Sequence, residues 1–272
     1  MIQLLSAATP GYPWTEPFRA SLDRHFDIPW RILETGKDIP LPGTRGQMLQ
    51  HGAFLEHLPE YKIEFHHDRL PQWDMVDPVI LFVDADMICQ RRLMPAEVML
   101  LNSLTERDIC VGLNGPRGET LAQEATQIGQ QVDDWVVDQL FPGWRELPAW
   151  NTGFVAARRS AYQRLYDQCR ALMPAAEWCF SHYAAVQWLM CYCLGRWLHH
   201  VELPQTIHLH GCWGAPAGLG WTATGEATLD GELVAFRHAI NLEPDKCVRW
   251  PGKTANNAKV SDAPDSAAPN RE

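Results

Sequence analysis

A short apolar run that ends in two carboxylates constrains the fold of this chain more than any other feature. The run Val79–Val83 follows Pro78 and leads directly into Asp84 and Asp86, which one alanine separates. A continuous apolar segment of this length, rich in Val and Ile, is typical of a strand buried on both faces in a parallel sheet covered by helices. Ligands of such sheets bind beyond the carboxyl ends of the strands. We therefore expect the two aspartates at a functional edge of an α/β sheet.

The Asp-x-Asp pattern indicates a divalent cation. In an extended chain, residues two apart point to one side, so Asp84 and Asp86 can face a common point. Two like charges repel each other there, and a bound cation would relieve that repulsion. Carboxylate oxygens suit Mg²⁺ or Mn²⁺, which keep open positions for water and phosphate oxygens. The alternative is that these aspartates cap a helix or begin a turn. We interpret Asp84-Ala85-Asp86 as a site for a metal and a diphosphate.

Length, charge and cysteine usage limit the class of protein. The chain has 272 residues, a formal net charge of −10 and eight cysteines without a Cys-x-x-Cys pair. The length allows one large α/β domain or two small ones, and we expect one over 1–253. From Thr254 the chain is small, polar and without apolar periodicity, which predicts a disordered tail over 254–272. The cysteines are expected to be reduced, mostly buried thiols. No signal segment and no apolar stretch of transmembrane length is recognisable, so we expect a cytoplasmic protein. The acidic balance gives no support for a general nucleic-acid surface.

Apolar periodicity predicts alternating strands and helices, as in α/β folds. We expect further strands at 2–7, 30–33, 108–113 and 197–203, and helices at 15–26, 93–104, 119–140 and 160–172. Thr15 is the expected N-cap of the first helix. The polarity of 123–134 predicts that the segment 119–140 is an exposed or lid-like insertion.

A second informative stretch is Trp150-Asn151-Thr152-Gly153, which opens an apolar strand. Gly153 permits a close approach of backbone, and Asn151 offers both donors and an acceptor to hydroxyl groups. Trp150 could give a sugar ring an apolar platform. The alternative is an ordinary turn before a core strand.

A third stretch places two histidines, His208 and His210, before Gly211. Neutral imidazole is a good third ligand for Mn²⁺ beside two carboxylates, although a structural histidine is the alternative. Arg45 precedes a predicted helix and could meet an anion at its N-terminus, or could be a solvated loop residue.

Taken in order, the three stretches resemble the GT-A-fold glycosyltransferases, most closely the glycogenin-like and lipopolysaccharide-galactosyltransferase-like enzymes of family 8. The resemblance covers roughly residues 1–215. It implies a mixed, mainly parallel Rossmann-like sheet and a nucleotide-diphosphate sugar donor, UDP-sugar first, held by Mn²⁺ (or Mg²⁺). The resemblance also implies roles for particular residues, with Asp84, Asp86 and His208 (or His210) on the metal, Asn151 and Gly153 lining the sugar pocket, Gly211 at the diphosphate, and Ala7, Ala8 and Thr9 at the nucleotide base. Among the candidate site residues, we expect Asp86, Asn151 and His182 to take part in catalysis.

The chain departs from the family at two places. The family's Lys-Pro-Trp has no counterpart after Gly211, and Arg45 could supply that positive charge instead. The family's Asp-Gln-Asp helix start is also missing, so no carboxylate is recognisable there, although His182 and Gln187 could contact sugar. Candidate general bases for the acceptor are Asp133, Asp134 and His182.

Two other functions remain open from the sequence. A sugar-phosphate nucleotidylyltransferase would use a similar sheet and metal, but the glycine-rich loop with a lysine is missing after the first strand. A noncatalytic nucleotide-sugar-binding module is the other alternative. For a transferase, the acceptor hydroxyl could belong to a glycan, a lipid-linked saccharide, a protein or a modified nucleic-acid base. The acidic balance lowers the last of these without excluding a local basic patch around Arg91, Arg92, Arg158 and Arg159. We expect these arginines to form a solvated rim instead.

Overall fold

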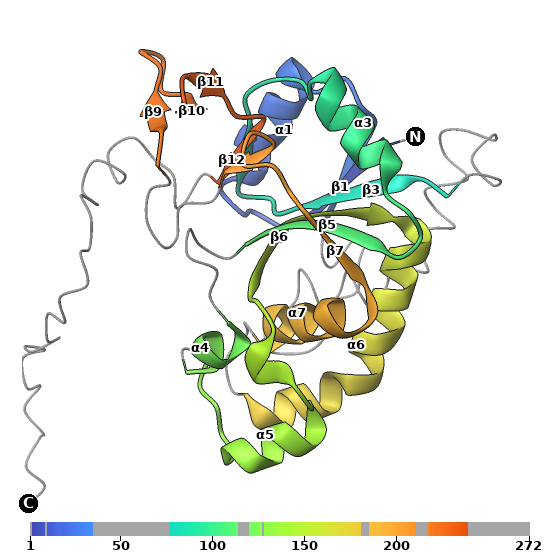
Figure 1. The fold of residues 1–272 in the computed structure, drawn as a ribbon. Helices are drawn as coiled ribbons and strands as arrows, with labels where there is room; N and C mark the ends of the chain where they lie inside the picture. The colour runs from blue at the N-terminus through green and yellow to red at the C-terminus, as the bar shows by residue number, and fades with distance from the viewer. Residues whose placement is uncertain are drawn as a thin grey trace, which may run out of the picture.

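A mixed six-stranded sheet with helices on both faces forms the centre of the protein (Figure 1). The structure is a computed structural model that describes residues 2–8, 10–34, 77–113, 120–126, 128–180, 185–209 and 217–238, without the side chain of residue 186. The sheet has the order β2-β1-β3-β6-β5-β7. Its strands are β1 (Ile2–Ala8), β2 (Trp30–Glu34), β3 (Val79–Val83), β5 (Asp108–Leu113), β6 (Trp150–Arg158) and β7 (His199–Glu202).

Strand direction in this sheet decides which residues meet. β1 runs parallel to β2 and β3, and β5 runs parallel to β7. β6 lies between β3 and β5 and is antiparallel to both. The start of β6 therefore lies beside the end of β3, which places the Asn-Thr-Gly stretch next to the Asp-x-Asp stretch. Every residue of β3 is buried, as the apolar run predicted.

Helices cover the two faces of the sheet and enclose separate apolar clusters. The helices are α1 (Thr15–His25), α3 (Pro95–Ser103), α4 (Leu121–Ala125), α5 (Asp134–Leu140), α6 (Arg159–Cys179), α7 (Ala185–Trp197) and the short 3-10 helix η2 (Trp144–Glu146). α1 and α3 lie on one side of the sheet, and α4 to α7 lie on the other (Figure 1). Phe18 and Leu22 of α1 belong to the first cluster, and Trp188 and Leu189 of α7 to the second.

Two small sheets complete the described fold. One has the order β4-β12-β8, from Met87–Cys89, Phe236–His238 and His208–Leu209. The other has the order β11-β10-β9, from Glu232–Leu233, Ala227–Leu229 and Leu219–Trp221. The first sheet brings the last described residues against the chain that follows β3.

The segment 119–140 was wrongly expected to be one exposed helix. It forms α4 and α5, which are separated by a bend where Gly129 has φ 69° and Gln130 bridges to Phe180. Its apolar side chains Leu121 and Val137 are fully buried in the core. The described part of this segment is therefore packed into the molecule, and even its polar residue Glu124 is only 5% exposed.

Smaller differences occur at helix ends. Trp14 occupies the N-cap position of α1, so Thr15 is its first helical residue. α6 continues through Pro174 as far as Cys179, beyond the expected end at 172. Six described cysteines are free and buried, as expected. Within the described ranges, no helix combines the length and the apolar character needed to cross a bilayer. The expected tail 254–272 lies outside the described residues.

Candidate metal centre

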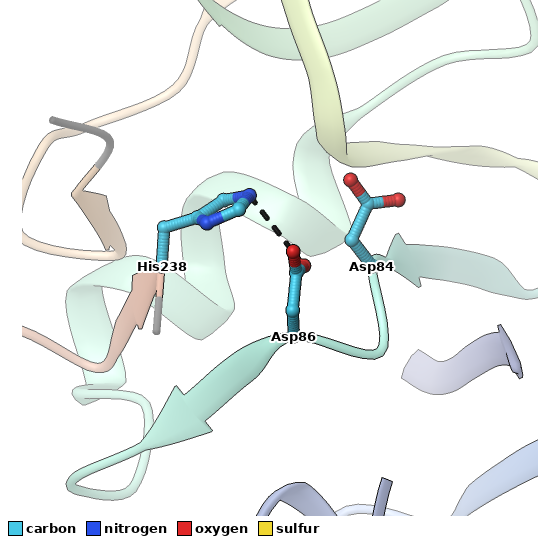
Figure 2. Close-up of side chains that lie close together, drawn as sticks. All are labelled: Asp84, Asp86 and His238. Carbon is cyan, nitrogen blue, oxygen red and sulfur yellow. Dashed lines mark ion pairs between the residues drawn. The ribbon is translucent and has the colours of Figure 1, made fainter. Parts of the chain in front are cut away.

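Asp84, Asp86 and His238 converge at the end of β3 (Figure 2). Their ligand atoms all lie within 4.8 Å of one another. The His238 ring and the Asp84 carboxylate lie on either side of Asp86 in Figure 2. The two aspartates meet because the chain turns at Ala85 and Asp86 before β4, and not because it stays extended. The histidine of this group is His238, and His208 is not part of it.

The three side chains have the donor atoms and spacing that a small divalent cation requires. Ligands on opposite sides of a Mg²⁺-sized ion are about 4 Å apart, since each bond is about 2.0–2.1 Å long. The group would therefore close around an ion with only a small movement. Asp86 Oδ1 is buried, has no hydrogen-bond partner among the described residues, and lies 3.5 Å from His238 Nε2. The two atoms are thus within ion-pair distance, and a cation bound there would satisfy Asp86 Oδ1.

Burial makes this site electrostatically unfavourable for bare carboxylates. Asp86 is 9% exposed. Burial raises the pKa of Asp86, and the neighbouring charge of Asp84 raises it further. The charge of His238 and a hydrogen bond from Tyr12 act in the opposite direction on that pKa but are outweighed. A cation would remove the repulsion between the two carboxylates and favour their charged forms.

The pairing of β4 with β12 carries His238 to this site. Met87 pairs with His238 and Cys89 with Phe236 in the antiparallel ladder. Gln90 continues the connection, because its amide donates to the carbonyl oxygens of Ala227 (3.0 Å) and Val234 (3.1 Å). The segment that follows Asp86 is therefore fastened to the segment that ends in His238.

An ion pair between Arg91 and Glu97 supports the same region. The two Arg91 Nη atoms donate to the two carboxylate oxygens of Glu97 at 2.8 and 2.7 Å. Glu97 Oε1 also accepts a hydrogen bond from Thr206, just before β8. Burial alone would raise the pKa of Glu97, but the hydrogen bonds and the charge of Arg91 outweigh it and lower that pKa. Arg91 is thus engaged within the fold.

Tyr12 joins the group from the loop that follows β1. Its hydroxyl donates to Asp86 Oδ2 at 3.2 Å. Burial raises the pKa of Tyr12, and the adjacent charge of Asp86 adds to that shift, so the phenol remains protonated and can donate. Tyr12 was not among the expected site residues.

The start of β6 closes one side of the metal group. The Asp84 amide donates to the Gly153 carbonyl oxygen at 2.8 Å. A Cβ atom at residue 153 would lie 2.7 Å from Asp84 Oδ2 and 3.0 Å from Asn151 Oδ1. Asn151 Oδ1 accepts the Gly153 amide at 3.0 Å, so it fixes this turn. Glycine is therefore required at 153 for the Asp84 carboxylate to lie where it does.

A buried polar chain lies on the other face of the same strand start. Thr152 Oγ1 donates to Gln187 Oε1 at 3.2 Å, and Gln187 Nε2 donates to Glu124 Oε1 at 2.6 Å. Thr152 and Glu124 are 1% and 5% exposed, whereas Gln187 is partly exposed. Burial raises the pKa of the Cys191 thiol, and the nearby charge of Glu124 contributes. The sequence showed no carboxylate at the start of α7. The structure places the Glu124 carboxylate of α4 near β6 instead.

Other expected site residues lie buried in the interior or exposed on the α5 side. Trp150 is 3% exposed within the core, with its ring tilted against His200, so this burial leaves no open ring face for a sugar. His208 is buried and stacks on Phe154. Asp133 and Asp134 are exposed on the α5 side, where Asp134 pairs with Arg145.

The remaining expected residues divide into two sets. Ala7, Ala8 and Ala85 are buried at the strand ends. Thr9, Arg45, His182, His210 and Gly211 lie outside the described residues.

No model of a known protein family and no curated protein matches the sequence. The function of the chain is therefore inferred from the site itself.

Proposed function

We propose that this protein is a metal-dependent glycosyltransferase of the GT-A type. It would move a sugar from a nucleotide-diphosphate sugar, UDP-sugar first, to an acceptor hydroxyl. The observation that carries the proposal is the convergence of Asp84, Asp86 and His238 beside the Asn-Thr-Gly start of β6. The mixed α/β sheet with this site at the end of β3 is compatible with the proposal.

The described residues would have different roles in the proposed site. Asp84, Asp86 and His238 would hold Mn²⁺ or Mg²⁺, which supplies charge stabilisation to the departing diphosphate. Asn151 and Gly153 form the wall that faces Asp84, where the sugar attached to that diphosphate would lie. Bond cleavage at the anomeric carbon leaves positive charge on the sugar, so correct placement of the acceptor hydroxyl is the main task of the protein.

The basic side chains give little support for a nucleic-acid acceptor. Arg91 pairs with Glu97, and Arg92 lies 3.4 Å from Asp27. Arg158 donates to the carbonyl oxygens of Asp77 and Leu104. These contacts hold Arg91 and Arg158 within the fold, whereas the Arg92 side chain is 72% exposed. We therefore favour a saccharide or protein hydroxyl as the acceptor.

Calorimetric titration with UDP, GDP, CDP and ADP, with and without Mn²⁺, tests the proposal. We expect one diphosphate to bind tightly only when Mn²⁺ is present, and Asp86→Asn to abolish that binding. Asp23→Asn is the matched control, because it removes the same charge from an exposed position on α1. If the folded wild-type protein binds none of the four nucleotides, the transferase proposal is wrong. Metal-dependent binding without transfer or hydrolysis of any sugar donor would favour the noncatalytic module.

A further inference from the structure

We propose that the Cys191 thiol is a positioning residue for the metal centre, because it holds Trp150, the first residue of β6, and through that strand the contact between Gly153 and Asp84. This role rests on the proposed function, since it concerns the metal site. Cys191 lies on α7 and is fully buried. α7 packs on the face of the sheet that is also covered by α4, α5 and α6 (Figure 1).

The thiol contacts both main-chain polar groups of Trp150. The Trp150 amide donates to Cys191 Sγ at 3.3 Å, and the thiol donates to the Trp150 carbonyl oxygen at 3.3 Å. A cysteine can accept and donate at the same time only while its thiol is protonated. Burial raises the pKa of the Cys191 thiol, so the proton is retained. A single side chain of α7 thus binds the start of β6 through the groups that a neighbouring strand would use.

The pairing of β6 with β5 is interrupted close to Trp150. Val111 of β5 pairs with Val155, whereas the next residue, Gly112, pairs with Asn151. One step along β5 therefore corresponds to four steps along β6, and the three β6 residues in between have no ladder partner on β5. Bulges of this kind redirect side chains and are frequent next to active sites. The position of the bulge depends on the contacts that hold its two ends.

The strand on the other side, β3, ends before it reaches Trp150. The last pair of that ladder is Val83 with Phe154, after which the Asp84 amide donates to the Gly153 carbonyl oxygen at 2.8 Å. Trp150 comes three residues before Gly153 and lies beyond this end of β3. Cys191 therefore supplies a contact at the end of the bulge that β3 does not reach.

The bulge carries the contacts that place the Asp84 carboxylate. Asn151 Oδ1 accepts the Gly153 amide at 3.0 Å, and a Cβ atom at residue 153 would lie only 2.7 Å from Asp84 Oδ2. Because the approach is this close, a small shift of Trp150 would move Asn151 and Gly153, and the Asp84 carboxylate would have to follow. The thiol thus acts on a metal ligand through the main chain of β6.

The test uses Cys191→Ala, with Cys193→Ala as the matched control. Both cysteines are buried on α7 and lose the same atom, but the Cys193 thiol faces Cys169 of α6. We expect the Kd for Mn²⁺ to rise about fivefold in Cys191→Ala, less than the 10–100-fold typical of groups bonded directly to a metal ligand. Cys193→Ala should keep the wild-type Kd.

A second measurement needs no metal. Amide hydrogen exchange, followed by nuclear magnetic resonance in Mn²⁺-free protein, reports the opening of individual hydrogen bonds. The amides of Asp84 and Gly153 should exchange several-fold faster in Cys191→Ala than in Cys193→Ala, because only the first variant releases the start of β6.

Cys191→Ser separates the hydrogen bonds from the packing. Serine and alanine leave nearly the same volume empty, but only the hydroxyl of serine can donate and accept as the thiol does. Positioning predicts that Cys191→Ser keeps a Mn²⁺ affinity closer to the wild-type value than Cys191→Ala does, whichever of the two variants is the more stable.

Two results would overturn this role for Cys191 alone. One is that Cys191→Ala and Cys193→Ala have equal Mn²⁺ affinities and equal exchange rates. The other is that the Mn²⁺ affinities of all three variants simply follow their unfolding free energies, in which case Cys191 is only a packing residue. If the folded wild type binds no Mn²⁺, the proposed function fails first, and the role of Cys191 fails with it.

Discussion

Met87 pairs with His238 in the antiparallel ladder between β4 and β12. Because Met87 directly follows Asp86, this pairing brings a histidine from the end of the described chain to a carboxylate at the end of β3. The resulting group depends on contacts between segments that are far apart in the sequence. Residues that fasten those segments should therefore affect the metal site as strongly as the ligands themselves.

Gly153→Ala tests the close approach of β6 to Asp84. The added Cβ would lie 2.7 Å from Asp84 Oδ2, so the carboxylate or the strand must move. We expect a loss of about 1–3 kcal/mol of unfolding free energy, as for other overpacked sites, and weaker Mn²⁺ binding. Chemical denaturation and a Mn²⁺ titration measure the two effects. Gly112→Ala on β5 is the control, because its Cβ would have no neighbour within 4 Å. Equal unfolding free energies and equal Mn²⁺ affinities of Gly153→Ala and Gly112→Ala would contradict this prediction.

Tyr12→Phe removes the hydrogen bond to Asp86 Oδ2 while preserving the ring. Partners that orient a metal ligand typically contribute 10–100-fold in metal affinity. We expect the Mn²⁺ affinity of Tyr12→Phe to fall about tenfold, at the lower end of that range. Tyr162→Phe provides the contrast, because the Tyr162 hydroxyl donates to the Val155 carbonyl oxygen within the core. That variant should lose about 1 kcal/mol of stability and keep its metal affinity. Unchanged Mn²⁺ affinity in Tyr12→Phe would show that the Tyr12 hydroxyl is not needed to orient Asp86.

Glu97→Gln tests the ion pair that supports β4. The Glu97 side chain is 5% exposed and that of its partner Arg91 is 16% exposed. Removing the Glu97 charge therefore leaves the largely buried Arg91 guanidinium without its ion-pair partner. We expect a loss of roughly 3–5 kcal/mol at neutral pH. Because the pKa of Glu97 is lowered on folding, this stabilisation is complete above its unfolded pKa of about 4.3 and disappears as the pH falls through the folded value.

Denaturant titrations of wild type and Glu97→Gln from pH 7 to pH 3 measure this dependence. The difference between the two proteins should shrink toward pH 3. The exposed pair Arg19–Glu16 on α1 provides the control, since Glu16→Gln should change stability by less than about 1 kcal/mol at any pH. A difference that stays constant across this pH range would mean that Glu97 acts through packing and not through charge.

Local sequence signals predicted several elements correctly. The strand Asp108–Leu113 was predicted from alternation, the first helix from apolar residues on one face, and the strand Val79–Val83 from its continuous apolar run. The same apolar run correctly placed Asp84 and Asp86 at a strand end. Its neighbour β6 could also be recognised, but its antiparallel direction could not, since direction depends on pairing and not on local pattern.

The third member of the metal group had no comparable signal. His238 ends a strand of three residues, and its position follows from pairing with the equally short β4. The local signal in the sequence is the short alternation Phe236-Arg237-His238. In the structure Phe236 and His238 are buried and Arg237 is less so. Glu124 was missed for a related reason. Its helix reads as polar, and only the fold shows that this residue faces inward.

The most direct test of the metal centre is the Mn²⁺ affinity of four proteins, measured from the free Mn²⁺ signal in electron paramagnetic resonance. The proteins are wild type, Asp86→Asn, His238→Ala and His208→Ala. The geometry predicts tight binding by wild type, a large loss in Asp86→Asn and His238→Ala, and near wild-type binding in His208→Ala. Loss of binding in His208→Ala with retention in His238→Ala would contradict the site described here. No binding by the folded wild type would contradict a metal centre altogether.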